Sequence, residues 1–164
     1  MTYLAPEFLH DVFVSYARGD ADSSGESPLK IWSKAFSREL ELELRIMPGL
    51  QNSSVFLDDS DRSGHSLNSN DPLTQQLRSA ATGSAFLLLL MSPHYLASPW
   101  CKDERAWWLR MAAANALPEI GSRLFVARIW PTGDSTWPAE LCDERGNPLR
   151  GVRFHARPGD ELTS

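Results

Sequence analysis

Cysteine, lysine and long apolar runs are scarce in this chain, and each scarcity excludes a class of protein. The 164 residues include two cysteines, Cys101 and Cys142, which make neither a disulfide framework nor a C-x-x-C metal site. Only three of the 16 Lys and Arg residues are lysine, and the formal net charge of -5 argues against a domain that binds nucleic acid by neutralising phosphates. The longest apolar run, Ala85 to Met91, is too short to cross a bilayer.

Targeting signals and familiar catalytic motifs are missing as well. The N-terminal stretch MTYLAPEFLHD has neither the basic nor the apolar region of a signal peptide, so we expect a cytoplasmic protein with no membrane partner. There is no G-x-G-x-x-G after a strand, no P-loop, no G-x-S-x-G and no H-E-x-x-H, and the four histidines lack metal-ligand spacing. We therefore expect no metal and no bound cofactor.

The length is that of one domain, which we expect to span 1–164. Its core should cover about 8–155, with 156–164 a tail or the start of a linker to a missing domain. Short apolar runs rich in Val, Ile, Phe and Leu read as strands that are buried on both faces. Four such runs and one weaker candidate lie at 12–14, 55–57, 86–91, 124–130 and 152–154.

Helical patterns fill the gaps between these runs. From Pro28 to Pro48-Gly49 a single apolar stripe includes Leu29, Trp32 and Phe36 and continues at steps of three and four. Further helices are predicted from Pro72 to Gly83, after Ser92-Pro93, and from Ser98-Pro99 to about Asn115, because a hydroxyl before proline is a typical helix start. The alternation predicts an α/β fold, a parallel sheet with helices on both faces.

Ligands in such sheets bind at the carboxyl ends of the strands. Here those ends carry Ser15, Tyr16 and Arg18 after the first strand, and Asp58-Asp59 after the second. Acidic residues at a strand end also mark phosphorylated receiver domains, which hold Mg²⁺. That alternative requires an acidic pair after the first strand and a lysine after the last, and the chain has neither.

A charged residue borders an aromatic stripe in the segment SPHYLASPWCKDERAWWLR at 92–110. On a helix, Trp100 and Trp107 lie on one face, with Glu104 at one edge of it and Asp103 as close to the other edge. A carboxylate in that place is unusual unless it is paired or functional. The alternative is a surface ion pair near the helix start, and geometry alone does not choose between the two acids.

Three segments, in this order and spacing, resemble the bacterial form of the Toll/interleukin-1 receptor (TIR) domain. They are HDVFVSYARGD at 10–20, SSVFLDDSD at 53–61, and SPHYLASPWCKDE at 92–104, the last matching the S-x-x-Y/F-x-x-S-x-W-C-x-x-E helix motif of the family. The resemblance implies a flavodoxin-like three-layer fold with strand order 2-1-3-4-5. It also implies cleavage of NAD⁺ to nicotinamide and ADP-ribose or a cyclic isomer, with NAD⁺ as substrate.

The motif glutamate is essential in such NAD⁺ nucleosidases, and it maps onto Glu104 rather than Asp103. A carboxylate suits this reaction because it stabilises the oxocarbenium charge that develops on the ribose. Trp100 either stacks on a ring of the substrate, as in bacterial relatives, or packs in the core. The remaining candidates for substrate contacts are Ser15, Tyr16, Arg18 and Asp58.

Association is the other property that the resemblance implies. The loop 59–71 occupies the place of the family's self-association loop, and Arg62, Ser63, Gly64 and His65 are its candidate residues. Relatives complete their active site with a neighbouring TIR protomer, so the expected partners are other TIR protomers and a sensor domain or protein. Two alternatives stay open: a non-catalytic adaptor that acts by TIR–TIR association, and a mimic that acts on host TIR signalling.

Overall fold

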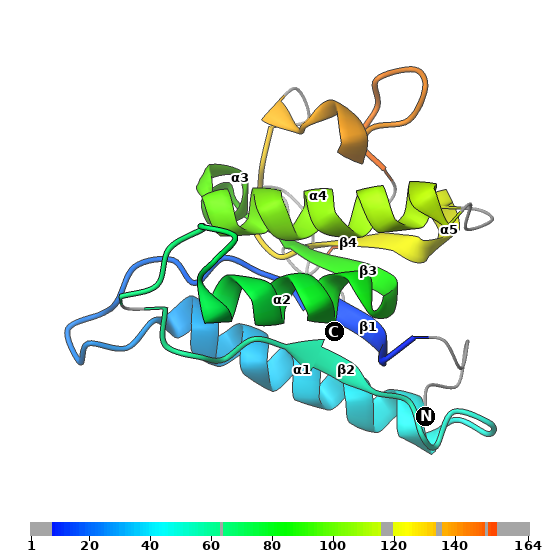
Figure 1. Ribbon diagram of the computed structural model, residues 1–164, viewed down its shortest axis with the longest axis horizontal. Coiled ribbons are helices and arrows are strands. Elements are labelled where there is room, and N and C mark those ends of the chain that lie inside the picture. The colour runs from blue at the N-terminus through cyan, green and yellow to red at the C-terminus, as the bar shows by residue number, and fades with distance from the viewer. Residues whose placement is uncertain (1–7, 63, 116–119, 134–135, 150, 154–164) are drawn as a thin grey trace, which may run out of the picture.

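The computed structural model describes residues 8–62, 64–115, 120–133, 136–149 and 151–153. They form an α/β fold around a parallel sheet of five strands in the order β2-β1-β3-β4-β5, the order that the resemblance to TIR domains implies (Figure 1). The strands are β1 (His10–Ser15), β2 (Val55–Leu57), β3 (Ser84–Met91), β4 (Leu124–Arg128) and β5 (Gly151–Arg153). The fourth strand is shorter than predicted, and the last residue of the predicted fifth strand, like the tail 156–164, lies outside the described residues.

Four helices begin with proline, and each is preceded by a side chain that caps it. They are α1 (Pro28–Ile46), α2 (Pro72–Thr82), α3 (Pro93–Ala97) and α4 (Pro99–Ala114); a short α5 (Ile120–Arg123) precedes β4. The side chains of Ser27, Asp71, Ser92 and Ser98 each accept a hydrogen bond from a backbone N–H in the first turn. Capping satisfies donors that have no partner inside the helix, and this explains why the predicted helix starts are correct.

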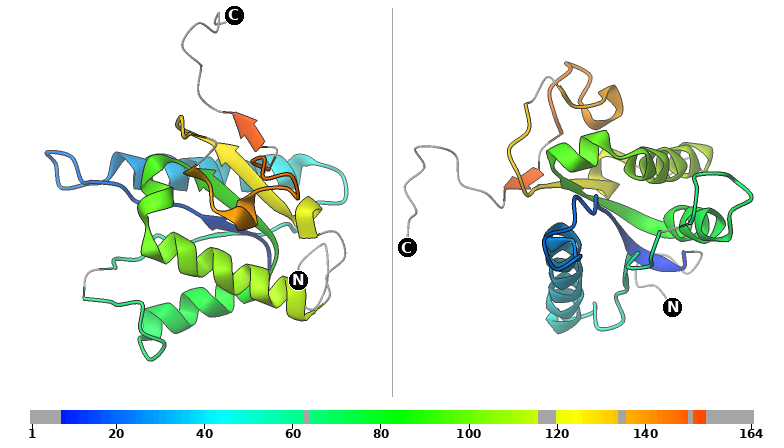
Figure 2. Two further views of the ribbon diagram at one scale, coloured as in Figure 1. Left: turned by 90° about the horizontal axis from the view of Figure 1, so that it is seen from above. Right: turned by 90° about the vertical axis from the view of Figure 1, so that its left-hand side faces the viewer.

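The helices cover the two faces of the sheet unequally. Helix α1 lies on one face, and α2 and α4 lie side by side on the other (Figure 2). The α2 and α4 face is the larger core, where Phe13, Leu87 and Leu89 of the sheet meet the buried Trp108. The α1 face is smaller. Its buried members are Val14, Tyr16, Leu90 and Ala127. No helix among the described residues is long and apolar enough to cross a membrane.

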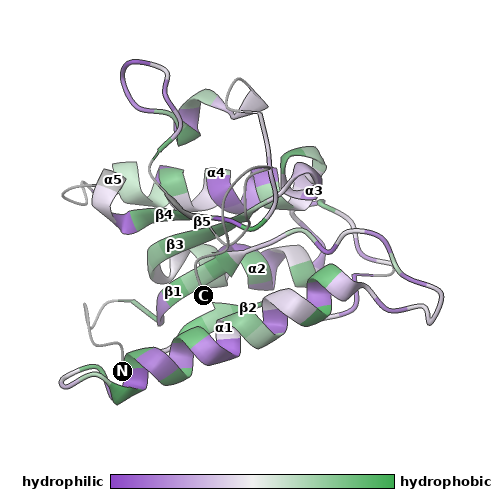
Figure 3. Cartoon of the chain, turned by 180° about the vertical axis from the view of Figure 1, so that it is seen from behind, coloured by the Kyte–Doolittle hydropathy of each residue, from purple (hydrophilic) through white to green (hydrophobic). Residues whose placement is uncertain are grey.

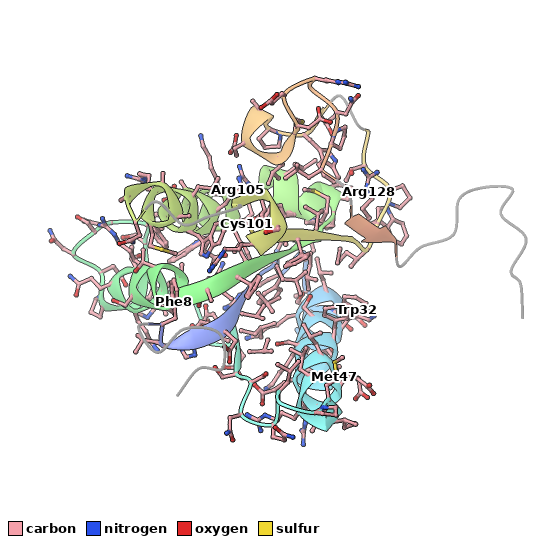
Figure 4. The ribbon with its side chains drawn as sticks, turned by 90° about the vertical axis from the view of Figure 1, so that its right-hand side faces the viewer. Phe8, Trp32, Met47, Cys101, Arg105 and Arg128 are labelled. Carbon is pink, nitrogen blue, oxygen red and sulfur yellow. The ribbon has the colours of Figure 1, made fainter. Side chains whose placement is uncertain are left out.

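Helix α1 packs along the predicted stripe except at Trp32. Leu29 and Phe36 pack against the core, but the two buried positions of the helix are Ser33 and Ser37. Trp32 is 41% exposed and lies on the side of the helix away from α2 and α4 (Figure 4). Small side chains let the helix approach the sheet closely, which turns Trp32 toward the edge of the contact. Apolar and polar residues alternate along the ribbon of α1 (Figure 3).

Candidate active site

The centre of the site is a carboxylate with almost no exposure to solvent. Glu104 lies in the second turn of α4, is 2% exposed, and meets the last residue of β1. The Ser15 hydroxyl donates a hydrogen bond of 2.7 Å to Glu104 Oε2, and its oxygen lies 3.1 Å from the hydroxyl of Tyr95 on α3. Three buried polar side chains from three elements therefore form one chain of hydrogen bonds at the carboxyl end of β1.

A planar cation covers this carboxylate. Arg62, in the loop after β2, donates from Nη2 to Glu104 Oε1 at 3.1 Å and contacts Asp58 Oδ2 at 3.3 Å. The same guanidinium lies over the ring of Trp100, with its central carbon 4.6 Å from the ring centroid. Trp100 and Glu104 are four residues apart on α4, so they face the same side of the helix. The site thus holds a flat, positively charged group between an aromatic face and two carboxylates.

A second arginine fixes the acidic residue at the end of β2. Arg18 Nη2 lies 2.8 Å from Asp58 Oδ2, and Arg18 also donates to the carbonyl of Ser60. On the other side of the sheet, the Tyr16 hydroxyl donates a hydrogen bond of 2.6 Å to the carbonyl of Asp58. These bonds tie the ends of β1 and β2 together and bring two arginines and two carboxylates into one cluster.

Burial dominates the electrostatics of Glu104. It raises the pKa of this carboxyl from the usual 4.5 to about 7, although Arg62 and the hydroxyl of Ser15 act in the opposite direction. The phenol of Tyr95, which is fully buried, also has a raised pKa because its anion would be poorly solvated. Near neutral pH, Glu104 therefore exists in both protonation states, which suits a group that must carry charge during a reaction.

Comparison with known proteins does not indicate a function for this chain. No protein-family model matches this chain, and no curated protein matches it. Among the described residues, no group of three or more His, Cys, Asp or Glu side chains could hold a metal ion.

The structure distinguishes the two acids that helical geometry leaves equivalent. Asp103 is half-buried and, within the described part of the chain, takes part in none of the bonds that organise the site. Glu104 accepts hydrogen bonds from both Ser15 and Arg62. Trp100 packs against the core, and the guanidinium of Arg62 lies over its ring; stacking of Trp100 on a substrate ring stays a prediction.

Other predicted site residues support the cluster in different ways. Ser15, Arg18 and Asp58 lie within it, but Tyr16 is 2% exposed in the core on the α1 face. Tyr16 contacts the cluster through the carbonyl of Asp58 and through the guanidinium of Arg18, which lies 5.9 Å from the centroid of its ring. Tyr16 is therefore placed to hold the strand ends together, and burial raises its pKa to about 12.

The loop residues expected to act in self-association differ in their positions and contacts. Arg62 turns inward to the carboxylate, His65 pairs with Asp71 at 2.8 Å, and Gly64 adopts a positive φ of 75°. Ser63 lies outside the described residues. The inward position of Arg62 is the part of the site that the sequence does not indicate, because a loop arginine carries no local signal for its partner.

Proposed function

We propose that this chain is a TIR-type NAD⁺ nucleosidase that cleaves the bond between nicotinamide and ribose. The observation that carries the proposal is the place of Arg62, whose flat cation lies against Trp100 and beside Glu104. The nicotinamide ring of NAD⁺ is also a flat cation. A site that holds one such group on an indole face beside a carboxylate has the chemistry to bind the other.

The reaction follows from what Glu104 can do to the sugar attached to that ring. As the C1′–N bond breaks, its electron pair moves to the ring nitrogen, which becomes neutral, and positive charge develops on the ribose. The ionised Glu104 stabilises this charge at short range in a buried site. Water, or a nitrogen of the adenine in the cyclising case, then attacks C1′ and releases one proton to solvent.

Substrate can bind only when Arg62 leaves the face of Trp100, since both cations need the same place. Arg62 belongs to the loop 59–71, which the resemblance assigns to association between protomers. We therefore propose that assembly moves this loop, and that the chain acts as an immune effector activated by oligomerisation. Control then resides in the partner protomers or in a sensor domain or protein.

The test measures nicotinamide release from NAD⁺ by the protein, both dilute and artificially clustered. Glu104→Gln keeps the shape of the side chain and removes its charge, and Asp103→Asn makes the same change one residue away on the same helix. We expect loss of at least about 100-fold in kcat for the first variant and little change for the second. Equal rates for clustered wild type and Glu104→Gln would refute the enzymatic function.

One observation favours the alternative of a non-catalytic TIR adaptor. The carboxylate is 2% exposed and already paired with Arg62, an arrangement that a purely structural ion pair would share. Under this alternative the clustered protein releases no nicotinamide, while Arg62→Ala reduces stability and leaves association between protomers unchanged.

A further inference from the structure

A cavity of about 550 Å³ lies at the carboxyl edge of the sheet, on the side of α1. Its walls come from three places in the chain: the first turns of α1, the start of α3, and the residues after β4. This volume is within the range of about 300–1,000 Å³ that ligand pockets occupy. The position also satisfies the rule that open α/β sheets bind ligands beyond the carboxyl ends of their strands.

Two exposed tryptophans line this cavity. Trp32 is 41% exposed and Trp130 is 63% exposed, and both line it. Trp32 is held by stacking on Phe36, with ring centroids 5.2 Å apart. The backbone N–H groups of Ile129 and Trp130 donate to the carbonyl of Met91, which fixes the segment after β4 against the end of β3. The aromatic walls are thus positioned before any ligand binds.

The remaining lining defines the chemistry of the ligand. Leu29, Pro93 and Ile129 are apolar, and among the described residues no Asp, Glu, Lys or Arg lines the cavity. The polar groups are the hydroxyl of Ser92 and the ring of His94, which has no hydrogen-bond partner within the described residues. An aromatic cavity that offers a hydroxyl and an imidazole, with no acidic residue, lysine or arginine among its described lining, matches a flat, uncharged heterocycle with polar atoms on its edge.

We propose that this cavity is a second binding site, separate from the Glu104 site, for a neutral planar heterocycle such as a purine base. Neighbouring residues of α3 belong to the two sites. Pro93 and His94 line the cavity, whereas the next residue, Tyr95, is fully buried and bonds Ser15 of the Glu104 site. The proposal rests on the cavity alone and does not depend on NAD⁺ cleavage.

Adenosine is the probe for this test, with ribose as the control that lacks the base. The protein carries Trp100→Ala, so that stacking on the Glu104 site cannot account for binding, and the indole N–H signals of the remaining tryptophans are followed by NMR. We expect the signals of Trp32 and Trp130 to shift saturably with adenosine, at a dissociation constant on the order of 0.1 mM. Ribose should shift neither signal.

Separate Trp32→Ala and Trp130→Ala variants in the same background should each weaken adenosine binding about tenfold, the usual effect of removing an aromatic ring from a stacked base. Both side chains are exposed, and thermal unfolding of each variant checks that the fold is kept. Three outcomes would overturn the proposal. They are shifts that do not saturate, equal shifts with ribose, and signals that move with protein concentration alone, which would assign the surface to a second copy of the chain.

Discussion

Replacing Glu104 by glutamine should make the protein more stable at pH 8 than the wild type, even though it removes a hydrogen-bonded and ion-paired group. The expectation follows from burial, which raises the pKa of this carboxyl from 4.5 to about 7. In a mildly alkaline buffer the wild type must hold a charge that its surroundings solvate poorly. Glutamine fills the same space and carries no charge.

The sign and size follow from proton linkage. As pH rises, the unfolded chain releases this proton near pH 4.5 and the folded chain only near pH 7, so the folded state binds more protons between these values. Stability therefore falls with pH across this window. At about 1.4 kcal/mol per pH unit, the destabilisation of the wild type by this group reaches about 3 kcal/mol at pH 8 and is about 1 kcal/mol at pH 5.

The assay is urea unfolding of the wild type and Glu104→Gln in parallel at several pH values from 5 to 8. The free energy of unfolding of the variant minus that of the wild type is plotted against pH, which cancels every other group that titrates equally in both. We expect this difference to rise by about 2 kcal/mol across the range. The size of this difference at any one pH also includes the effect of changed hydrogen bonds between glutamine and Ser15 or Arg62. The slope of the difference against pH is therefore the quantity that tests the prediction.

A flat line would refute the reasoning, because it would mean that the carboxyl titrates alike in both states. A falling line would mean that Arg62 holds Glu104 ionised more strongly than burial opposes it. Repeating the pair in an Arg62→Ala background adds a check. Arg62 lowers the pKa of Glu104, so its removal should extend the rising part of the plot to higher pH.

Three further outcomes are expected. For NAD⁺ cleavage, Arg62→Ala should lower KM between about twofold and thirtyfold by freeing the ring that substrate needs, and an unchanged KM would contradict this competition. With a thiol reagent at pH 8, Cys142 should react in the native protein and Cys101 only after unfolding, because burial and Glu104 raise the pKa of Cys101 to about 12. Ser33→Ala should leave the free energy of unfolding unchanged or raise it by up to about 1 kcal/mol, since the hydroxyl is buried with no partner in the described chain; a larger loss would reveal a partner.

The strands and helix starts of this fold could be predicted because their signals are local. A run such as Val12-Phe13-Val14 is apolar on both faces, and Ser98 before Pro99 is enough to begin a helix. The exposure of Trp32 could not be predicted, for the opposite reason. Its periodicity places it on the apolar side of α1, but the depth at which the helix packs depends on Ser33, and nothing in the periodicity shows that a serine would be buried.

The candidate site was predictable in part. Ser15 and Asp58 could be placed because parallel strands end at a common edge. Helical geometry brings both Asp103 and Glu104 to the edge of a tryptophan stripe, and only the resemblance to the TIR motif selects Glu104. The inward turn of Arg62 could not, since it depends on contacts with residues 42 positions away. The cavity at Trp32 and Trp130 was also unforeseen, because it requires three separate segments to meet.

The different anchors of Glu104 have a consequence for amide hydrogen exchange. Ser15 ends β1, which is paired on both sides, by β2 and β3, and is covered on both faces, so its neighbours should exchange only when much of the domain opens. Arg62 lies outside the sheet, in a stretch that a small local opening can release. We therefore expect one oxygen of the carboxylate to be bonded to a slowly exchanging segment and the other to a faster one. Arg62 can therefore move away from the carboxylate while Ser15 stays in place.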